Sequence, residues 1–67
     1  MRYKGYQLES SVQPLPNGMF AANLAIFRAA SPYDKPRLFD ALDYFHEAAP
    51  ALEYASDWGR IWVDECG

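Results

Sequence analysis

Cysteine is nearly absent from this sequence of 67 residues, which contains only Cys66. A single thiol cannot close an internal disulfide, so the class of small secreted proteins held together by disulfides is excluded. Long apolar runs are also missing, and no charged segment followed by an apolar one opens the sequence. Neither a membrane span nor a signal peptide is therefore predicted. A lone thiol suits a reducing compartment, and we expect a cytoplasmic protein without a membrane partner.

Basic residues are few as well, with six Lys and Arg against nine Asp and Glu and a net charge of −3. This balance disfavours a general nucleic-acid binder. The charges are also unevenly distributed, because residues 1–37 carry a net +3 and residues 38–67 a net −6. Any functional interpretation has to account for a basic half joined to an acidic half.

Apolar residues are abundant, with 51% hydrophobic and 16% aromatic content, which argues against disorder. The chain is long enough for one domain, 1–67, and too short for a second hydrophobic core. The loss of conformational entropy on folding costs about 100 kcal/mol of free energy. Burial of about 4,000 Å² of apolar surface contributes a similar stabilising free energy. Because this balance is close to zero, a partner or a second copy would help the fold.

Three segments are predicted to be strands, at residues 2–12, 19–28 and 37–44. Residues 2–12 alternate between apolar and polar side chains, which predicts a half-buried strand. Residues 13–18 contain two prolines and an Asn-Gly pair, and they predict a tight hairpin turn. After a predicted loop at 29–36, residues 37–44 predict a third strand whose ambiguous alternation allows a bulge.

The second predicted strand, 19–28, is apolar on both faces. One face holds Phe20, Ala22, Leu24 and Ile26, and the other holds Met19, Ala21, Asn23, Ala25 and Phe27. A strand of this kind is usually central and covered on both sides. A helix is the alternative, since Ala and Leu dominate, but the turn signals at both ends favour a strand.

A helix is predicted over residues 47–65. Its apolar stripe is formed by Ala48, Leu52, Ala55, Gly59, Trp62, Val63 and Cys66. Pro50 is tolerated only in the first turn, so the helix begins close to it or bends there. Gly59 would let the helix backbone approach the sheet, and Trp62 would be the largest core side chain.

The predicted fold is therefore α+β, a three-stranded antiparallel meander with one C-terminal helix packed on one face. Such a helix leaves the other face bare, and exposed apolar area usually marks an interface. The candidate interface residues on that face are Met19, Ala21, Ala25 and Phe27. A second candidate is a ridge on the outer side of the helix, formed by Tyr54, Trp58 and Ile61. Alternatively, the two aromatic residues of this ridge wrap onto strand edges.

Four basic residues are expected at one end of the sheet, where the first strand begins, the second ends and the third begins. They are Lys4, Arg28, Lys35 and Arg37. With nearby aromatic rings they could contact a phosphate backbone. Alternatively, the returning helix delivers Asp64, Glu65 and the terminal carboxylate to neutralise them. Head-to-tail contact between copies is a third interpretation.

Residues with catalytic or metal-binding chemistry are isolated in the sequence. His46 has no second His or Cys nearby, so a role in capping the helix is favoured over metal binding. Cys66 has no histidine next to it that could act as its base. Phosphate-binding loops and nucleophile motifs are also missing. We expect no enzyme, no metal and no cofactor.

Three stretches resemble a known group. They are Tyr54-Ala-Ser-Asp-Trp-Gly-Arg-Ile-Trp-Val-Asp64, Tyr3-Lys-Gly-Tyr6 and Phe20-x-Ala-x-Leu-x-Ile26. Together they resemble short proteobacterial proteins of the Burkholderia type, and only the Trp-Gly-Arg-x-Trp helix is distinctive. The resemblance implies a single domain with a small antiparallel sheet and a C-terminal helix. It implies no activity, so it assigns no functional residue. In this group the helix is expected to begin with Ser or Thr followed by an acidic residue, and His46 and Pro50 depart from that pattern.

The functional hypothesis is a non-enzymatic protein-interaction module that self-associates through the bare sheet face or the helix ridge, a homodimer being one form that fits. The alternative is a small nucleic-acid-binding domain that uses the basic end of the sheet.

Overall fold

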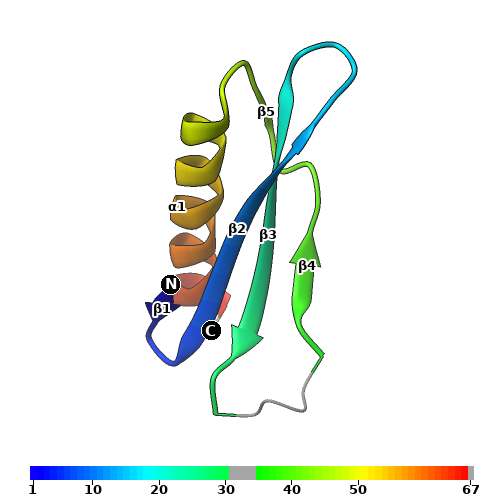
Figure 1. Cartoon of the computed structure of the whole chain (residues 1–67). Helices are drawn as coiled ribbons and strands as arrows, with labels where there is room; N and C mark the ends of the chain where they lie inside the picture. The colour runs from blue at the N-terminus through cyan, green and yellow to red at the C-terminus, as the bar shows by residue number, and fades with distance from the viewer. Residues whose placement is uncertain (31–34, 67) are drawn as a thin grey trace.

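A computed structural model of the chain describes residues 1–30 and 35–66. Its elements are β1 (Arg2–Tyr3), β2 (Tyr6–Pro14), β3 (Phe20–Arg28), β4 (Arg37–Phe39), β5 (Tyr44–Phe45) and α1 (Ala48–Cys66). The strands form an antiparallel sheet in the order β1-β2-β3-β4, with β5 also paired to β3, and α1 packs on one face of it (Figure 1). The α+β prediction is confirmed. Part of the predicted loop, residues 31–34, lies outside the described residues.

The predicted first strand is interrupted near its start. Lys4 (φ 48°) and Gly5 (φ 86°) both take left-handed backbone angles and reverse the chain. As a result β1 folds back on β2, where the Met1 carbonyl accepts a 2.7 Å hydrogen bond from the Leu8 amide. The prediction of one continuous strand over 2–12 is wrong at this turn, and β2 also continues to Pro14.

The long hairpin of β2 and β3 is the centre of the fold, with nine residue pairs in register from Tyr6↔Arg28 to Pro14↔Phe20. Gly18 takes a φ of 83° at its tip, which glycine adopts without steric cost. The Asn17 side chain accepts a hydrogen bond from the Met19 amide in the same turn. The predicted hairpin turn and the extended conformation of 19–28 are both confirmed, and the helix alternative for this segment is wrong.

The predicted third strand is split into β4 and β5. Four residues, 40–43, stand opposite only two residues of β3, 22 and 23, so two extra residues loop out of the ladder. Ala41 lies in this bulge with a φ of 53°, and its amide donates a 2.8 Å hydrogen bond to Asn23 Oδ1. The sequence allowed for a bulge, but the single strand over 37–44 is a wrong prediction.

The core lies between the sheet and α1. Leu8, Ala22, Leu24 and Ile26 face the helix and are at most 2% exposed. The helix buries a straight row of small residues at every fourth position, namely Ala51, Ala55, Gly59 and Val63. Ala55, Gly59 and Val63 belong to the predicted stripe, whereas Ala51 was not part of it. Leu52 and Cys66 are exposed, Ala48 is half-buried, and Trp62 is a half-buried residue at the core's margin, so their assignment to the buried stripe is corrected.

Small residues in the helix allow the close approach that the sequence predicted. A Cβ added at Gly59 would lie 3.1 Å from Leu24 Cδ2 and 3.1 Å from Leu8 Cδ1, which is tighter than normal carbon contact. Beside it, the Ser56 hydroxyl donates a 3.2 Å hydrogen bond to the Ser10 hydroxyl across the same interface. Pro50 lies in the first turn of α1, as expected.

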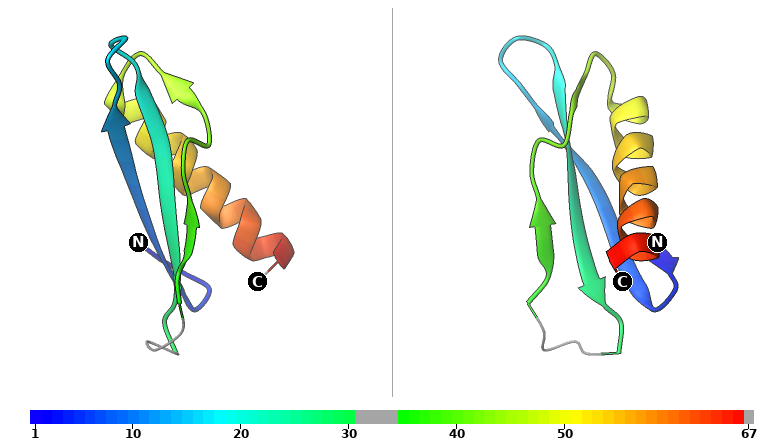
Figure 2. Two further views of the ribbon diagram at one scale, coloured as in Figure 1. Left: turned by 90° about the vertical axis from the view of Figure 1, so that its right-hand side faces the viewer. Right: turned by 180° about the vertical axis from the view of Figure 1, so that it is seen from behind.

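The molecule is elongated, with principal extents of 39 × 21 × 16 Å. Its Cα radius of gyration is 12.3 Å, against about 11 Å for a compact domain of this length. Figure 2 shows why: α1 crosses one face of the sheet obliquely, and no other element formed by residues 1–30 and 35–66 lies on the opposite face. No helix in the described part of the chain is long and apolar enough to cross a membrane.

Candidate functional site

The face of the sheet opposite α1, called here the open face, carries the odd-numbered residues of β3. Pairing places Leu38 of β4 beside Ala25 and Tyr44 of β5 beside Ala21 on this same face. Leu38 is 68% exposed and Tyr44 is 51% exposed, and both are among the most exposed large apolar side chains of the described residues. The sequence missed both, because the alternation of the third strand did not reveal which face each residue takes.

Three of the four sheet candidates, Ala21, Ala25 and Phe27, are odd-numbered residues of β3 on the open face, whereas Met19 precedes β3, and all four are less exposed than expected. Ala21 is only 2% exposed, and Met19, Ala25 and Phe27 are half-buried. Ala21 is therefore corrected from a contact residue to part of the packed sheet. The apolar surface available to a partner is centred on Leu38 and Tyr44, with the half-buried residues of β3 between and beside them.

The open face has a polar half and an apolar half. The β2 half carries Gln7, Glu9, Ser11 and Gln13. The other half, on β3, β4 and β5, is apolar except for Asn23, whose side-chain oxygen is used by the Ala41 amide. The open face therefore has the apolar side of β3 that the sequence predicted, and β2 contributes the polar side of its predicted half-buried alternation.

The predicted ridge on α1 is largely used within the fold. Tyr54 packs against Phe45 with ring centroids 5.4 Å apart, and Trp58 packs against Phe39 at 4.6 Å. Ile61 stays well exposed, at 58%, and Tyr54 keeps 37% of its surface exposed. The two aromatic residues thus wrap onto β4 and β5, the alternative that the sequence analysis left open, and no continuous apolar ridge remains.

At the basic end, the helix supplies a counter-charge to one of the four predicted cations. Lys4 Nζ lies 2.6 Å from Asp64 Oδ1, and the Tyr3 hydroxyl donates to the same carboxylate at 3.0 Å. The hydrogen bond between the two charged groups raises the pKa of Lys4 and lowers that of Asp64. Lys4 is therefore neutralised within the chain, as one of the three interpretations predicted.

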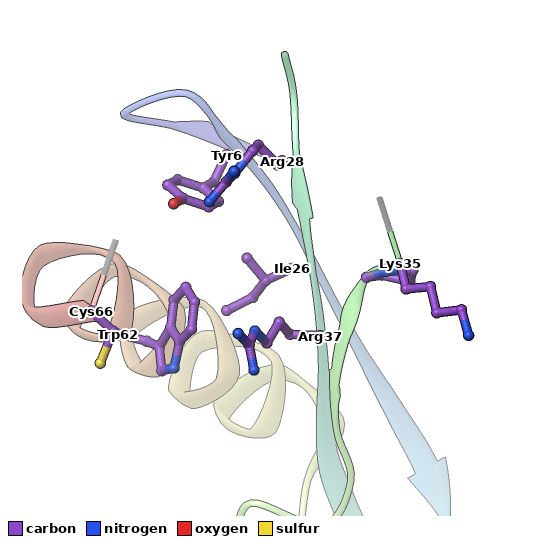
Figure 3. A pocket seen from close by; sticks show the side chains of 8 residues that line it. Tyr6, Ile26, Arg28, Lys35, Arg37, Trp62 and Cys66 are labelled. Atoms are coloured by element: carbon purple, nitrogen blue, oxygen red, sulfur yellow. The ribbon is translucent and has the colours of Figure 1, made fainter. Parts of the chain in front are cut away.

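The remaining three cations all border one pocket. Arg28, Lys35 and Arg37 line this pocket of about 760 Å³ between the sheet and the C-terminal part of α1, together with Tyr6, Trp62 and other residues. Figure 3 shows both guanidinium groups on the helix side of the sheet, whereas the ammonium group of Lys35 points away on the other side. Of the four basic residues expected to cluster, three therefore border one pocket, and Lys4 is paired with Asp64 instead.

His46 and Cys66 are both exposed, and they lie at opposite ends of the helix. His46 stands two residues before α1 begins, where a helix-flanking role was expected. Among residues 1–30 and 35–66, no group of three or more His, Cys, Asp or Glu side chains is placed to hold a metal ion.

The chain matches no family model, and neither a curated protein nor a solved structure is similar to it. The resemblance to short proteobacterial proteins therefore stays a prediction, and the functional argument depends on the geometry alone.

Proposed function

We propose that this protein is an interaction module that self-associates, with two copies packing their open faces together. The observation that carries the proposal is the exposure of Leu38 and Tyr44 on the one sheet face that no helix covers. Exposed apolar side chains that share a face mark interaction surfaces more often than scattered ones do. The use of Tyr54 and Trp58 inside the fold supports this face over the helix ridge.

A second copy is favoured as the occupant because the apolar half of the open face is self-complementary. In a two-fold dimer the same patch meets itself, so a patch without charge avoids like-charge repulsion. Leu38, Tyr44, Ala25 and Phe27 carry none, whereas Glu9, which pairs with Ala25 in the ladder, belongs to the polar β2 half. Two such sheets would stack about 10 Å apart, with a helix on each outer side.

The size of the open face predicts a weak dimer. Nine-residue strands at about 3.4 Å per residue and three strands at about 4.8 Å spacing give about 450 Å² per copy. A stable interface of standard size buries about 800 Å² per partner. The expected association is therefore transient, with a dissociation constant in the micromolar range or weaker.

Sedimentation velocity between about 1 and 500 µM tests the proposal. The wild-type protein should shift from a 7.6 kDa monomer toward twice that mass, whereas Leu38→Glu should stay monomeric, because a buried unpaired carboxylate is costly. Ile61→Glu is the matched control: Ile61 is similarly exposed, at 58%, but lies on α1. A wild-type monomer at every concentration contradicts the proposal, and loss of association only in Ile61→Glu contradicts the choice of face.

The nucleic-acid alternative has less support. It required four cations to contact phosphates together, but Lys4 is held by Asp64 and the Lys35 ammonium points away from the pocket. An acidic chain with net charge −3 also repels a polyanion.

A further inference from the structure

We propose that the pocket between α1 and the end of the sheet binds a small anion that carries a flat aromatic ring. Aromatic carboxylates and nucleoside monophosphates share this chemistry. The pocket's volume of about 760 Å³ falls within the range of small-molecule sites, which is about 300–1,000 Å³. It lies on the face opposite to Leu38, so the inference does not depend on self-association.

Positive charge in the pocket comes from two neighbouring strands. Arg37 stands opposite Ile26 in the ladder, and Arg28 follows two residues later on the same side of β3. Residues placed diagonally in this way lie about 7–8 Å apart, close enough for both guanidinium groups to approach one anion. Among the described lining residues none is acidic. Arg28 is also engaged within the chain, so Arg37 is the main anchor and Arg28 adds positive potential.

The walls of the pocket are aromatic. Tyr6 and Trp62 meet edge to face, with ring centroids 6.1 Å apart and planes at 85°. Arg37 lies over the Trp62 ring at 5.9 Å from its centroid, so the anchor and a stacking surface are already adjacent. A planar ligand can stack on an aromatic wall while its anionic group accepts paired hydrogen bonds from the guanidinium. Figure 3 shows Trp62, Ile26 and the Arg37 guanidinium side by side within the pocket.

The surroundings select a single small anion over a nucleic-acid strand. The helix beside the pocket exposes Glu65 near its C-terminal end, and that end adds negative dipole charge. A polyanion that follows the sheet would come close to these negative groups and be repelled by them, whereas a single anionic group bound at Arg37 would not. The pocket's size fits one ring system with its anionic substituent.

Titration of the ¹⁵N-labelled protein with 2-naphthoate, followed by NMR, tests the inference. We expect shifts of the Trp62 indole and Arg37 side-chain signals, about tenfold weaker binding in Arg37→Gln, and unchanged binding in the control Arg60→Gln, because Arg60 pairs with Asp57 on α1 and is not among the residues that line the pocket. The neutral analogue 2-naphthamide should bind at least about tenfold more weakly than 2-naphthoate. Equal binding of the two compounds, or an affinity insensitive to Arg37→Gln, overturns the proposal.

Two further titrations distinguish a free mononucleotide from a nucleic-acid strand as the ligand. Adenosine monophosphate should shift the same signals as 2-naphthoate, and a ten-residue oligothymidylate should bind no more tightly than the mononucleotide. Tighter, salt-sensitive binding of the oligonucleotide overturns the small-ligand assignment. The Leu38→Glu variant should bind 2-naphthoate normally, so failure of self-association and failure of the pocket are distinguishable.

Discussion

At the scale of single residues, the contact between Lys4 and Asp64 has a measurable pH signature. The hydrogen bond from Lys4 lowers the pKa of Asp64, and the Tyr3 hydroxyl acts in the same direction. A lowered folded-state pKa stabilises the fold at pH values above the unfolded pKa, and the stabilisation is lost as the pH falls through the folded one. Lys4 has the opposite dependence: its raised pKa stabilises the fold below the unfolded value and is lost at strongly alkaline pH.

We predict that Lys4→Met raises the pKa of the Asp64 carboxyl group toward its ordinary value, as measured by a ¹³C NMR titration of the side-chain carboxylates. Arg60→Met is the control, because Arg60 pairs with Asp57 on the same helix and does not contact Asp64. An Asp64 titration that is unchanged in Lys4→Met would show that the ion pair does not form in solution.

At the scale of elements, the helix approaches the sheet closely because Gly59 has no side chain. Substitution by Ala brings about 1 kcal/mol of helix propensity. It also places a methyl group 3.1 Å from two buried leucine methyl groups, and overpacking of this kind costs about 1–3 kcal/mol. We therefore predict that Gly59→Ala lowers the free energy of unfolding by about 1 kcal/mol in urea denaturation.

A double-mutant cycle separates the two effects. In a Leu24→Val background one of the two close methyl contacts is removed, so the same Gly59→Ala change should cost at least about 0.5 kcal/mol less. A gain of stability from Gly59→Ala in the wild-type background would contradict the close packing of α1 on β2 and β3.

The bulge between β4 and β5 places Ala41 at a φ of 53°, a left-handed angle that costs a non-glycine residue about 1 kcal/mol. Ala41→Gly should therefore raise the free energy of unfolding by up to about 1 kcal/mol, and Ala41→Val should lower it, because a β-branched residue fits this angle poorly. Urea denaturation of both variants checks the pair. Equal stabilities would mean that residue 41 does not take this conformation.

The same bulge marks the limit of what the sequence revealed. The Asn-Gly turn and the alternation of 2–12 predicted the central hairpin, because tight turns and half-buried strands leave clear local patterns. A left-handed alanine leaves none, so the sequence could not show where within 40–43 two extra residues loop out, or that Leu38 and Tyr44 share the open face. The helix stripe was predicted in part: Ala55, Gly59 and Val63 were assigned to it, but the stripe was centred on larger side chains such as Leu52 and Trp62 and so left out Ala51.

At the scale of the whole molecule, folding leaves a thin core. The exposed surface is 4617 Å², against about 11,000 Å² for the extended chain, so about 60% of the surface is buried, the share usual for a domain of about 60 residues. The core's buried residues are three larger aliphatic residues on the sheet, one valine on the helix and several alanines. A domain with so few large buried side chains gains measurably from any surface that a second copy covers.

This gain predicts a concentration-dependent melting temperature. Association of folded chains stabilises them by mass action, and for a dimer each tenfold rise in concentration above the dissociation constant adds about 0.7 kcal/mol per chain. In a domain of this length that corresponds to about 3–6 °C. We expect the melting temperature of the wild type, measured by circular dichroism between about 10 µM and 1 mM, to rise by about 3–6 °C for each tenfold increase in concentration above the dissociation constant.

Leu38→Glu should melt at the same temperature at every concentration, whereas Ile61→Glu should keep the wild-type dependence on concentration. A wild-type melting temperature independent of concentration would mean that the open face stays in contact with water.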